Sequence, residues 1–537
     1  MTPDYTSWTN ADLIARVTDL EQQLRSQNTS HSLPPTPSPA PPKKKPKKPS
    51  KAFDPSRYNT RLIALKFAYL GGNYNGFEHH NNNTTPLPTI EEELWKALNK
   101  TKLIFPEYKS GQREGEEVSW EGVEYSKCGR TDRGVSAFGQ VVGVKVRSSR
   151  PKQKKVKVVE DSAGSDSPMP DAAEVEEKQK EWDHIRDELP YIQLLNRVLP
   201  PDIRVLAWCP DPPEDFSARF SCKERRYRYF FTNPAFVPLP GSRPKSENGR
   251  PGEGWLDVEA MEQAAKKYEG LHDFRNLCKV DPSKQIADFS RRIFHAGIHE
   301  VQSQRGIAAD TSSPKLYYFE VRGSAFLWHQ VRHLVAVLFL VGQGYESPSI
   351  VDELLDTQKT PAKPHYEMAS DIPLVLWDCI FPSAEEIARA DHADGEADQP
   401  SYTDALNWIY VGDGIGGRDP AKRSTTGIED GKYGRNGIMD ELWALWRQRK
   451  MDEVLARSLM DVVASSGHLP DVTKLTPADV AEKSVRLYDG GPVPRAVGPY
   501  TPLMQRERME TPEVVNARYA ARKGLDKKVQ ADVDVDE

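Results

Sequence analysis

Eight consecutive apolar residues at positions 334–341 (LVAVLFLV) restrict the fold of this chain more than any other feature. They follow Arg332 and His333 within the segment 326–341, which has the length and apolar density of a buried helix. The run is far shorter than the ~20 apolar residues that a bilayer-spanning helix requires. The chain must therefore build a core that surrounds this helix, and we expect no membrane partner.

Strand-like and helix-like patterns alternate between residues 61 and 382. Ile63, Leu65 and Phe67 recur at every second position, as on a strand with one buried face. Thr89 and Asp257 each precede a helix-like segment, where the side chain is placed to cap it. Interspersed strands and helices are typical of an α+β (mixed) fold or of a mixed α/β arrangement. We predict helices at 89–98, 191–198, 257–268 and 326–341, and strands at 63–69, 142–146, 227–232 and 316–321.

Polar segments flank and interrupt this region. Hydrophobic residues make up 37% of the chain and charged residues 28%, which indicates a globular core diluted by disordered segments. We divide the chain into an N-terminal helix (1–30), a Pro/Lys-rich linker (31–60), a folded region (61–382) with a disordered insertion (151–181), and a C-terminal extension (383–537).

The N-terminal segments carry two patterns, each open to two interpretations. Apolar residues in the first helix form a short seam that fits either a marginal coiled coil or a helix docked on its own domain. The linker carries a lysine cluster typical of a nuclear import signal or a nucleic-acid patch, or simply of a solvated linker. The seam consists of Leu13, Val17, Leu20 and Leu24, and the cluster of Lys43, Lys44, Lys45, Lys47 and Lys48.

The net charge of −6 does not exclude a nucleic-acid partner, because its distribution is uneven. Residues 383–537 contain 28 acids and 21 bases, so the acidity belongs to the C-terminal extension. The five cysteines show no CxxC spacing, which predicts neither a zinc knuckle nor a disulfide framework. We expect an intracellular protein without a metal site.

The densest chemical signal is YSKCGRTDRGVSAFGQ at residues 125–140. Gly129 and Gly134 bracket a segment in which Asp132 lies between two arginines, and nearby positive charge keeps a carboxylate ionised. A carboxylate on a tight loop can serve as a nucleophile or a base. Taken alone, the motif also fits an Asp–Arg ion pair in a surface turn.

Two further segments add to this signal. Residues 216–229 (FSARFSCKERRYRY) interleave arginines with aromatic rings. RNA-binding surfaces combine the two in this way, because nucleobases stack on the rings and basic side chains contact the phosphates. The same pattern fits a strand with arginines on its wet face. Arg332 lies within the apolar helix and needs a partner, either a structural acid or Asp132.

These segments give the chain a recognisable resemblance. CGRTDRGVSAFGQVV resembles the catalytic motif of the TruA family of tRNA pseudouridine synthases, and further blocks follow in the family's order: LPPDIRVLAW, DFSARFSCKERRYRYFF, GLHDFRNLCKVD and FLWHQVRHLVAVLFLVGQG. The FGQ after the motif, FLWHQVRHL and KPHYEMASDIPLVLWDC are most similar to the eukaryotic branch that modifies positions 38 and 39 of the tRNA anticodon stem-loop.

The resemblance implies a role for each matching residue. It makes Asp132 the catalytic carboxylate, Arg130 the arginine that helps to displace the target base, Tyr227 the active-site tyrosine and Arg332 the partner of Asp132. It implies a pseudouridine synthase fold over 61–382, with a central, mainly antiparallel sheet flanked by helices. For RNA binding we expect Lys127, Arg133, Arg219, Arg225 and Arg226.

One pair of adjacent residues departs from the family's pattern. Bacterial members tend to carry Trp-Gln after the first glycine-rich turn, where this chain has Phe77 and Glu78. The family's pattern therefore assigns no RNA contact to Phe77 or Glu78.

The implied reaction converts uridine to pseudouridine within tRNA and needs no cofactor or metal. The resemblance also implies a homodimer, and we expect the protein in the nucleus and cytoplasm.

One alternative function is that of a catalytically silent RNA-binding protein on the same fold. A glycosidase normally needs paired carboxylates, and the motif supplies one. A third reading takes His272 and Asp273 as an acid–base pair, against a structural hydrogen bond at a helix end.

Overall fold

The computed structural model describes Arg16 and residues 53–80, 85–108, 117–152, 182–238, 242–245, 249–301, 314–392, 402–413, 431–434, 437–467 and 485–524. The chain divides into two units, Met1–Asp54 and Pro55–Glu537. In the first unit Arg16 is helical. The rest of the predicted N-terminal helix, the lysine cluster and residues 153–181 of the predicted insertion lie outside the described residues.

A ten-stranded sheet forms the centre of the second unit, in the order β10-β4-β1-β3-β9-β5-β8-β7-β6, with β2 paired to β3. β3 and β9 run parallel, and the other pairs are antiparallel. The mainly antiparallel sheet predicted from the resemblance is thus confirmed. The strands are β1 (Asn59–Tyr69), β2 (Ser126–Lys127), β3 (Ser136–Ser148), β4 (Ile203–Cys209), β5 (Glu224–Asn233), β6 (Gly270–Asp273), β7 (Ser290–Glu300), β8 (Lys315–Gly323), β9 (Leu374–Ile380) and β10 (Ile409–Tyr410).

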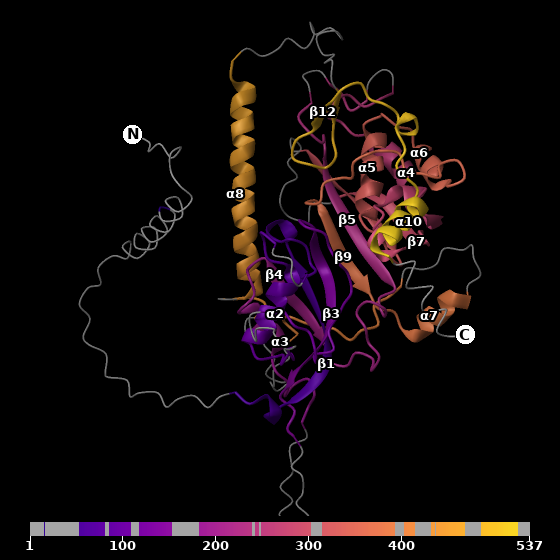
Figure 1. Ribbon diagram of the computed structural model, residues 1–537. Helices are drawn as coiled ribbons and strands as arrows, with labels where there is room; N and C mark the ends of the chain where they lie inside the picture. Colours follow the sequence, from indigo (N-terminus) through magenta and orange to yellow (C-terminus); the bar gives the residue numbers. More distant parts are fainter. Residues whose placement is uncertain are drawn as a thin grey trace, which may run out of the picture. The chain divides into compact units, whose positions relative to one another are not determined.

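Helices pack beside this sheet, which makes the fold a mixed α+β fold (Figure 1). The predicted caps are confirmed: Thr89 accepts a hydrogen bond from Glu92 N, and Asp257 accepts one from Ala260 N. The α-helices are α2 (Ile90–Lys100), α3 (Tyr191–Asn196), α4 (Val258–Lys266), α5 (Gln330–Gly342), α6 (Ile350–Leu355), α7 (Ala384–His392), α8 (Ile438–Ser465) and α10 (Pro512–Lys523). Short 3-10 helices occupy Pro55–Arg57, Gly71–Asn73, Arg275–Leu277, Pro282–Lys284 and Leu503–Gln505.

The apolar helix α5 is buried, as its sequence predicts. Leu334, Val337 and Leu338 are fully buried. The helix begins at Gln330, four residues later than predicted, because His329 adopts a left-handed backbone conformation with φ of 59° that a helix cannot continue through. In the described part of the chain, no helix combines the length and apolarity that crossing a bilayer requires.

Two hydrophobic clusters fill the second unit. The first packs α2 and α3 against β1, β3 and β4, and the second packs α4, α5 and α6 against β5, β7 and β8. Strand β9 contributes to both, through Leu376 to the first cluster and Leu374 to the second. The sheet therefore joins two cores along β9.

Parts of the predicted C-terminal extension complete these cores. Leu487, Tyr488 and Leu503 are buried in the second cluster, and β10 adds to the sheet beside β4. A two-stranded sheet, β11 (Val485–Leu487) with β12 (Arg495–Val497), precedes α10. Residues 485–524 are thus packed on the region that the resemblance covers.

Helix α8 (Ile438–Ser465) has a different environment from the other helices (Figure 1). Ile438 is its buried residue, and Glu441 Oε2 lies 2.8 Å from Arg204 Nη2. Several large apolar side chains along it are exposed, including Trp443, Leu455 and Leu459.

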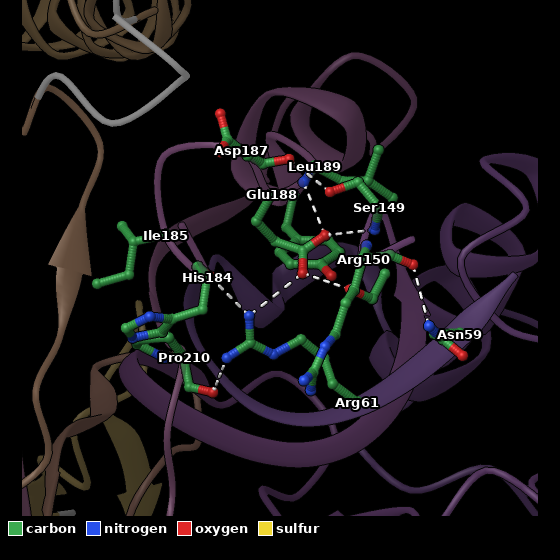
Figure 2. A network of polar contacts seen from close by, with 12 residues as sticks. Asn59, Arg61, Ser149, Arg150, His184, Ile185, Asp187, Glu188, Leu189 and Pro210 are labelled. Atoms are coloured by element: carbon green, nitrogen blue, oxygen red, sulfur yellow. Dashed lines mark hydrogen bonds and ion pairs between the residues drawn. The ribbon is translucent and has the colours of Figure 1, made fainter. Parts of the chain in front are cut away.

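A polar network joins the two chain segments that border residues 153–181 (Figure 2). The buried Glu188 carboxylate accepts hydrogen bonds from Ser148 Oγ at 2.6 Å, Ser149 N at 2.8 Å and Leu189 N at 2.9 Å. Arg61 Nη1 lies 3.2 Å from the same carboxylate. The end of β3 and the start of the next described segment are therefore held together.

We expect Glu188→Ala to lower the free energy of unfolding by about 3–5 kcal/mol, because Arg61 would lose its buried partner. Asp211→Asn is the matched control, since Asp211 also pairs with Arg61 but is 62% exposed, and it should cost less than about 1 kcal/mol. Urea titrations at pH 7 measure both. Equal losses in the two variants would contradict the role of Glu188.

The same network predicts a pH dependence. Burial alone would raise the pKa of Glu188, but its hydrogen bonds from Ser148, Ser149 and Leu189 lower it below 4.5. A carboxyl with a lowered pKa stabilises the fold at neutral pH and loses this contribution as the pH falls through its folded value. The stability difference between wild type and Glu188→Gln should therefore shrink below pH 4.5.

Candidate active site

A cleft of about 630 Å³ opens where the two cores meet. Its lining comes from the loop between β2 and β3, from β5, from the residues before α5, and from the segment that precedes β7. Seven residues singled out from the sequence line it: Lys127, Arg130, Asp132, Arg219, Arg225, Tyr227 and Arg332.

Asp132 lies on a tight turn that enters β3. Val135 N donates to Asp132 O at 3.2 Å, which closes the turn. Gly134 has φ of 81°, and a Cβ added there would lie 2.6 Å from Asp371 Oδ2. This conformation and close approach explain the glycine that follows Asp132 and Arg133.

The loop before Asp132 is clamped from both sides. Tyr69 Oη lies 2.8 Å from Thr131 Oγ1, and Phe77 N donates to Thr131 O at 3.0 Å. The buried Gln140 side chain accepts from Gly129 N at 3.1 Å and donates to Gly129 O at 3.0 Å. Asp132 is therefore carried on a backbone that the neighbouring strands hold in place.

The carboxylate of Asp132 is 30% exposed to the cleft, and its neighbour is a histidine that we did not predict. His329 Nε2 lies 3.3 Å from Asp132 Oδ2, and His329 Nδ1 is buried without a hydrogen-bond partner. The signal was available, because His329 lies in the FLWHQVRHL block that also contains Arg332.

The ion pair expected between Arg332 and Asp132 is absent among the described residues. Arg332 Nε instead donates to Ala369 O at 2.7 Å, although the side chain lines the same cleft. His329, the residue just before α5, reaches the carboxylate, whereas Arg332 inside the helix contacts the backbone of residue 369. This part of the prediction is corrected.

Tyr227 stands on β5 at the seam between the two cores. It is half-buried, packs against both hydrophobic clusters, and meets the Phe326 ring edge-on at a centroid distance of 5.0 Å. Burial raises the pKa of its phenol above the usual value, so the ring is neutral at physiological pH. A neutral aromatic ring at this place can pack against a base in the cleft.

Two acidic residues hold the cations at the other side of the cleft. Glu78 lies 3.2 Å from Arg130 Nη1 and 2.9 Å from Lys127 Nζ, and the buried Glu91 lies 2.8 Å from the same lysine. Burial raises the pKa of Glu78, but Lys127 and Arg130 outweigh it and lower the pKa overall. Glu78, the residue that departs from the bacterial pattern, thus anchors Arg130, and the charge of Lys127 is largely neutralised.

The arginines expected to bind RNA have different environments. Arg219 is exposed at the cleft, with its guanidinium 5.3 Å from the Phe220 ring centre. Arg225 is engaged by backbone carbonyls, of Ser324 at 2.8 Å and of Arg219 at 3.0 Å. Arg219 and Phe220 therefore offer the exposed basic and aromatic pair, whereas Arg225 ties the cleft wall together.

Two other arginines do not line the cleft. Side chains alternate along β5, so Arg226 lies on the opposite sheet face from Arg225 and Tyr227, where its Nε donates to Glu224 at 2.6 Å. Arg133 is exposed but lies outside the cleft lining. Among the predicted RNA contacts, we therefore place Arg226 on the wrong face for this cleft.

Three buried thiols lie beside Asp132's loop. Cys128, Cys222 and Cys379 have their sulfur atoms within 4.8 Å of one another. Among the described residues, these are the side chains close enough together to share a metal ion, and thiolates prefer soft metals. Burial raises the pKa of Cys128, which favours its protonated form.

The His272–Asp273 pair has structural contacts instead of catalytic ones. His272 Nε2 lies 2.7 Å from Glu269 O, just after α4, and Asp273 pairs with Arg275 at 2.8 Å. Neither residue lines the cleft. The structural interpretation of this motif is confirmed.

Comparisons with known proteins assign the chain to a family. The family model described as tRNA pseudouridine synthase matches residues 264–382. The tRNA pseudouridine(38/39) synthase of Saccharomyces cerevisiae is 34% identical over an alignment that covers 97% of this chain and 92% of the relative.

Other relatives match over a shorter range. The tRNA pseudouridine(38/39) synthase of Bos taurus is 44% identical over 62% of this chain, and the match spans 58% of that protein's length. The tRNA pseudouridine synthase A of Polynucleobacter asymbioticus is 29% identical over 55% of this chain and 82% of its own length. The chain thus spans less than two thirds of the mammalian relatives it matches.

The turn at Gly134 generates a prediction. Gly134→Ala should lower the free energy of unfolding by about 1–3 kcal/mol, because an alanine must adopt the left-handed backbone that glycine tolerates. Gly72→Ala is the matched control, since a Cβ there meets nothing within 4 Å and the cost should be below about 0.5 kcal/mol. Urea titration measures both, and equal effects would contradict the constraint on the turn.

Proposed function

The chain belongs to the TruA family of tRNA pseudouridine synthases, and from this membership we propose that it isomerises uridine to pseudouridine in the anticodon stem-loop of tRNA, at positions 38 and 39. Relatives from yeast and mammals carry names with these two positions. The observation that carries the proposal is Asp132, an accessible carboxylate on a rigid turn inside a cleft that joins both cores.

The reaction breaks the N1–C1′ bond of uridine and reattaches the base through C5, with no change in composition. A base stacked in the RNA must first leave the stack, which costs a few kcal/mol. Asp132 then attacks C1′ or C6, or removes a sugar proton to give a glycal. All three routes need an ionised carboxylate within reach of the extruded nucleotide.

The neighbouring side chains fit roles around that carboxylate. His329 orients Asp132 by its contact at 3.3 Å. Arg130, anchored by Glu78, stands where it can occupy the space vacated by the base. Tyr227 packs against the base, and Arg332 contributes positive charge to the cleft wall without a direct pair to Asp132.

Two other functions are less well supported. A glycosidase would need a second free carboxylate, but Asp281, which also lines the cleft, pairs with Lys284 at 3.1 Å. A catalytically silent RNA-binding protein needs Arg219 and Phe220 but has no use for the clamped loop that presents Asp132. Turnover by the wild-type protein separates enzyme from silent binder.

We also propose that the protein acts as a homodimer and that it resides in the nucleus and the cytoplasm. The family resemblance supports the dimer. The lysine cluster at residues 43–48 supports nuclear import.

The Asp132→Asn variant tests the proposed reaction. It should melt at the wild-type temperature and bind tRNA, but its rate of pseudouridine formation should fall by about 10³-fold or more, because the attacking or proton-accepting group is lost. Since the product has the mass of uridine, carbodiimide labelling followed by primer extension detects it. Wild-type turnover in the variant would refute the role of Asp132.

Light scattering of the full-length protein tests the dimer. A homodimer should show twice the chain mass of 60.5 kDa at micromolar concentration. A single-chain mass that persists as the protein concentration rises would contradict the proposal.

A further inference from the structure

A second hollow, of about 620 Å³, lies next to the cleft of Asp132. Arg332 and Lys279 line both spaces and therefore separate them. The remaining wall comes from residues 363–370, at the start of the KPHYEMASDIPLVLWDC block, and from residues 489–509 of the C-terminal part. We call this space the Lys363 pocket.

Lys363 is a largely enclosed cation whose contacts are neutral. Its Nζ donates to Cys278 O at 3.0 Å and lies 2.9 Å from His333 Nε2. Burial, with the charge of Lys363, lowers the pKa of His333 to about 2, so the imidazole carries no charge. Burial also lowers the pKa of Lys363 itself, to about 8, and leaves the amine largely charged at neutral pH.

The two other cations of the pocket also lack a carboxylate partner among the described residues. Lys279 is exposed, with its Nζ 4.5 Å from the Trp328 ring centre. Arg332 uses Nε for the carbonyl of Ala369. Three cations thus line one hollow without a carboxylate partner among the described residues, and for the largely buried Lys363 this is costly unless an anion enters.

The acids that line the pocket do not supply this counter-charge. Glu367 lies 2.7 Å from Arg495 Nη1, and Asp489 lies 3.1 Å from Arg495 Nε. Both carboxylates therefore pair with one arginine, which is not among the lining residues. The net charge facing the space remains positive.

The C-terminal part of the chain holds the pocket wall by backbone hydrogen bonds. Met509 N donates to Lys363 O at 2.8 Å, His365 N donates to Glu507 O at 2.9 Å, and Ser370 N donates to Asp489 O at 2.8 Å. The C-terminal segment, which carries no recognisable motif in the sequence, thus positions Lys363.

We propose that the Lys363 pocket binds a backbone phosphate of the substrate RNA beside the nucleotide that enters the cleft, with Lys363, Arg332 and Lys279 around it. The proposal rests on the proposed function, since it requires RNA in the cleft of Asp132, with which the pocket shares Arg332 and Lys279. Lysine and arginine are the usual partners of RNA phosphates, and such contacts set the position of the strand.

The test is the salt dependence of tRNA binding by full-length Lys363→Met. Losing one phosphate contact should make the slope of log K against log salt less steep by about 0.7–0.9 and weaken binding roughly threefold or more at low salt. Lys359→Met is the matched control, because Lys359 is 78% exposed, pairs with Asp356 and lies outside the pocket. Its slope should equal that of the wild type.

A second arm locates the phosphate. The RNAs are stem-loops that each carry one uncharged methylphosphonate linkage, at a different position. The wild-type protein should bind most weakly to the RNA whose uncharged linkage lies next to the target uridine. In Lys363→Met that linkage should no longer matter, as a double-mutant cycle requires for a direct contact. Lys279→Met, a change at an exposed residue, repeats the test if Lys363→Met has a lowered melting temperature.

The outcomes separate this proposal from the proposed function. An unchanged salt slope in Lys363→Met and Lys279→Met, or equal sensitivity to every linkage in wild type and variants, overturns the pocket even if pseudouridine forms. If Lys363→Met loses the phosphate contact but the wild-type protein makes no pseudouridine, the proposed reaction is overturned and the phosphate pocket is not.

Discussion

The parallel contact between β3 and β9 is the constraint on which the rest of the site depends. Ser136 and Ala137 of β3 pair with Val375 and Leu376 of β9, and this contact joins the two hydrophobic cores. Asp132 lies just before β3, and Tyr227 lies on β5. Strand β5 is the other neighbour of β9 (Figure 1). A shift in this register would move the carboxylate of one core away from the ring of the other.

Charge is arranged in layers around that junction. Glu78 and Glu91 neutralise Lys127 and anchor Arg130, so the cations nearest the turn are held within the protein. Asp132 itself meets only His329 among the described ionisable side chains. Positive charge without carboxylate partners collects farther out, around the Lys363 pocket, where a polyanion can reach it.

The C-terminal part belongs to this architecture and is not an appendage. Gly490 approaches Tyr229 so closely that a Cβ there would lie 1.8 Å from the phenol oxygen. Tyr488 packs on Phe339 of α5 at a ring distance of 4.7 Å, and Gln343 donates to its carbonyl at 3.0 Å. The apolar helix that most restricts the fold is thus covered partly by residues more than a hundred positions later in the chain.

The sequence by itself determined much of the local structure, and its resemblance to a family singled out Asp132 as the candidate carboxylate. Periodicity located β1, and apolar density located α5. The caps of α2 and α4 were read from Thr89 and Asp257, and two glycines marked the turn of Asp132. These features depend on residues within a few positions of one another, where backbone sterics and side-chain hydrogen bonds act. Only the tertiary structure decided that His329 and not Arg332 contacts Asp132, that Arg226 faces away from the cleft, and that Lys363 stands beside it. Such contacts follow from strand order, register and the first residue of a helix, and the pattern of any single segment does not encode them.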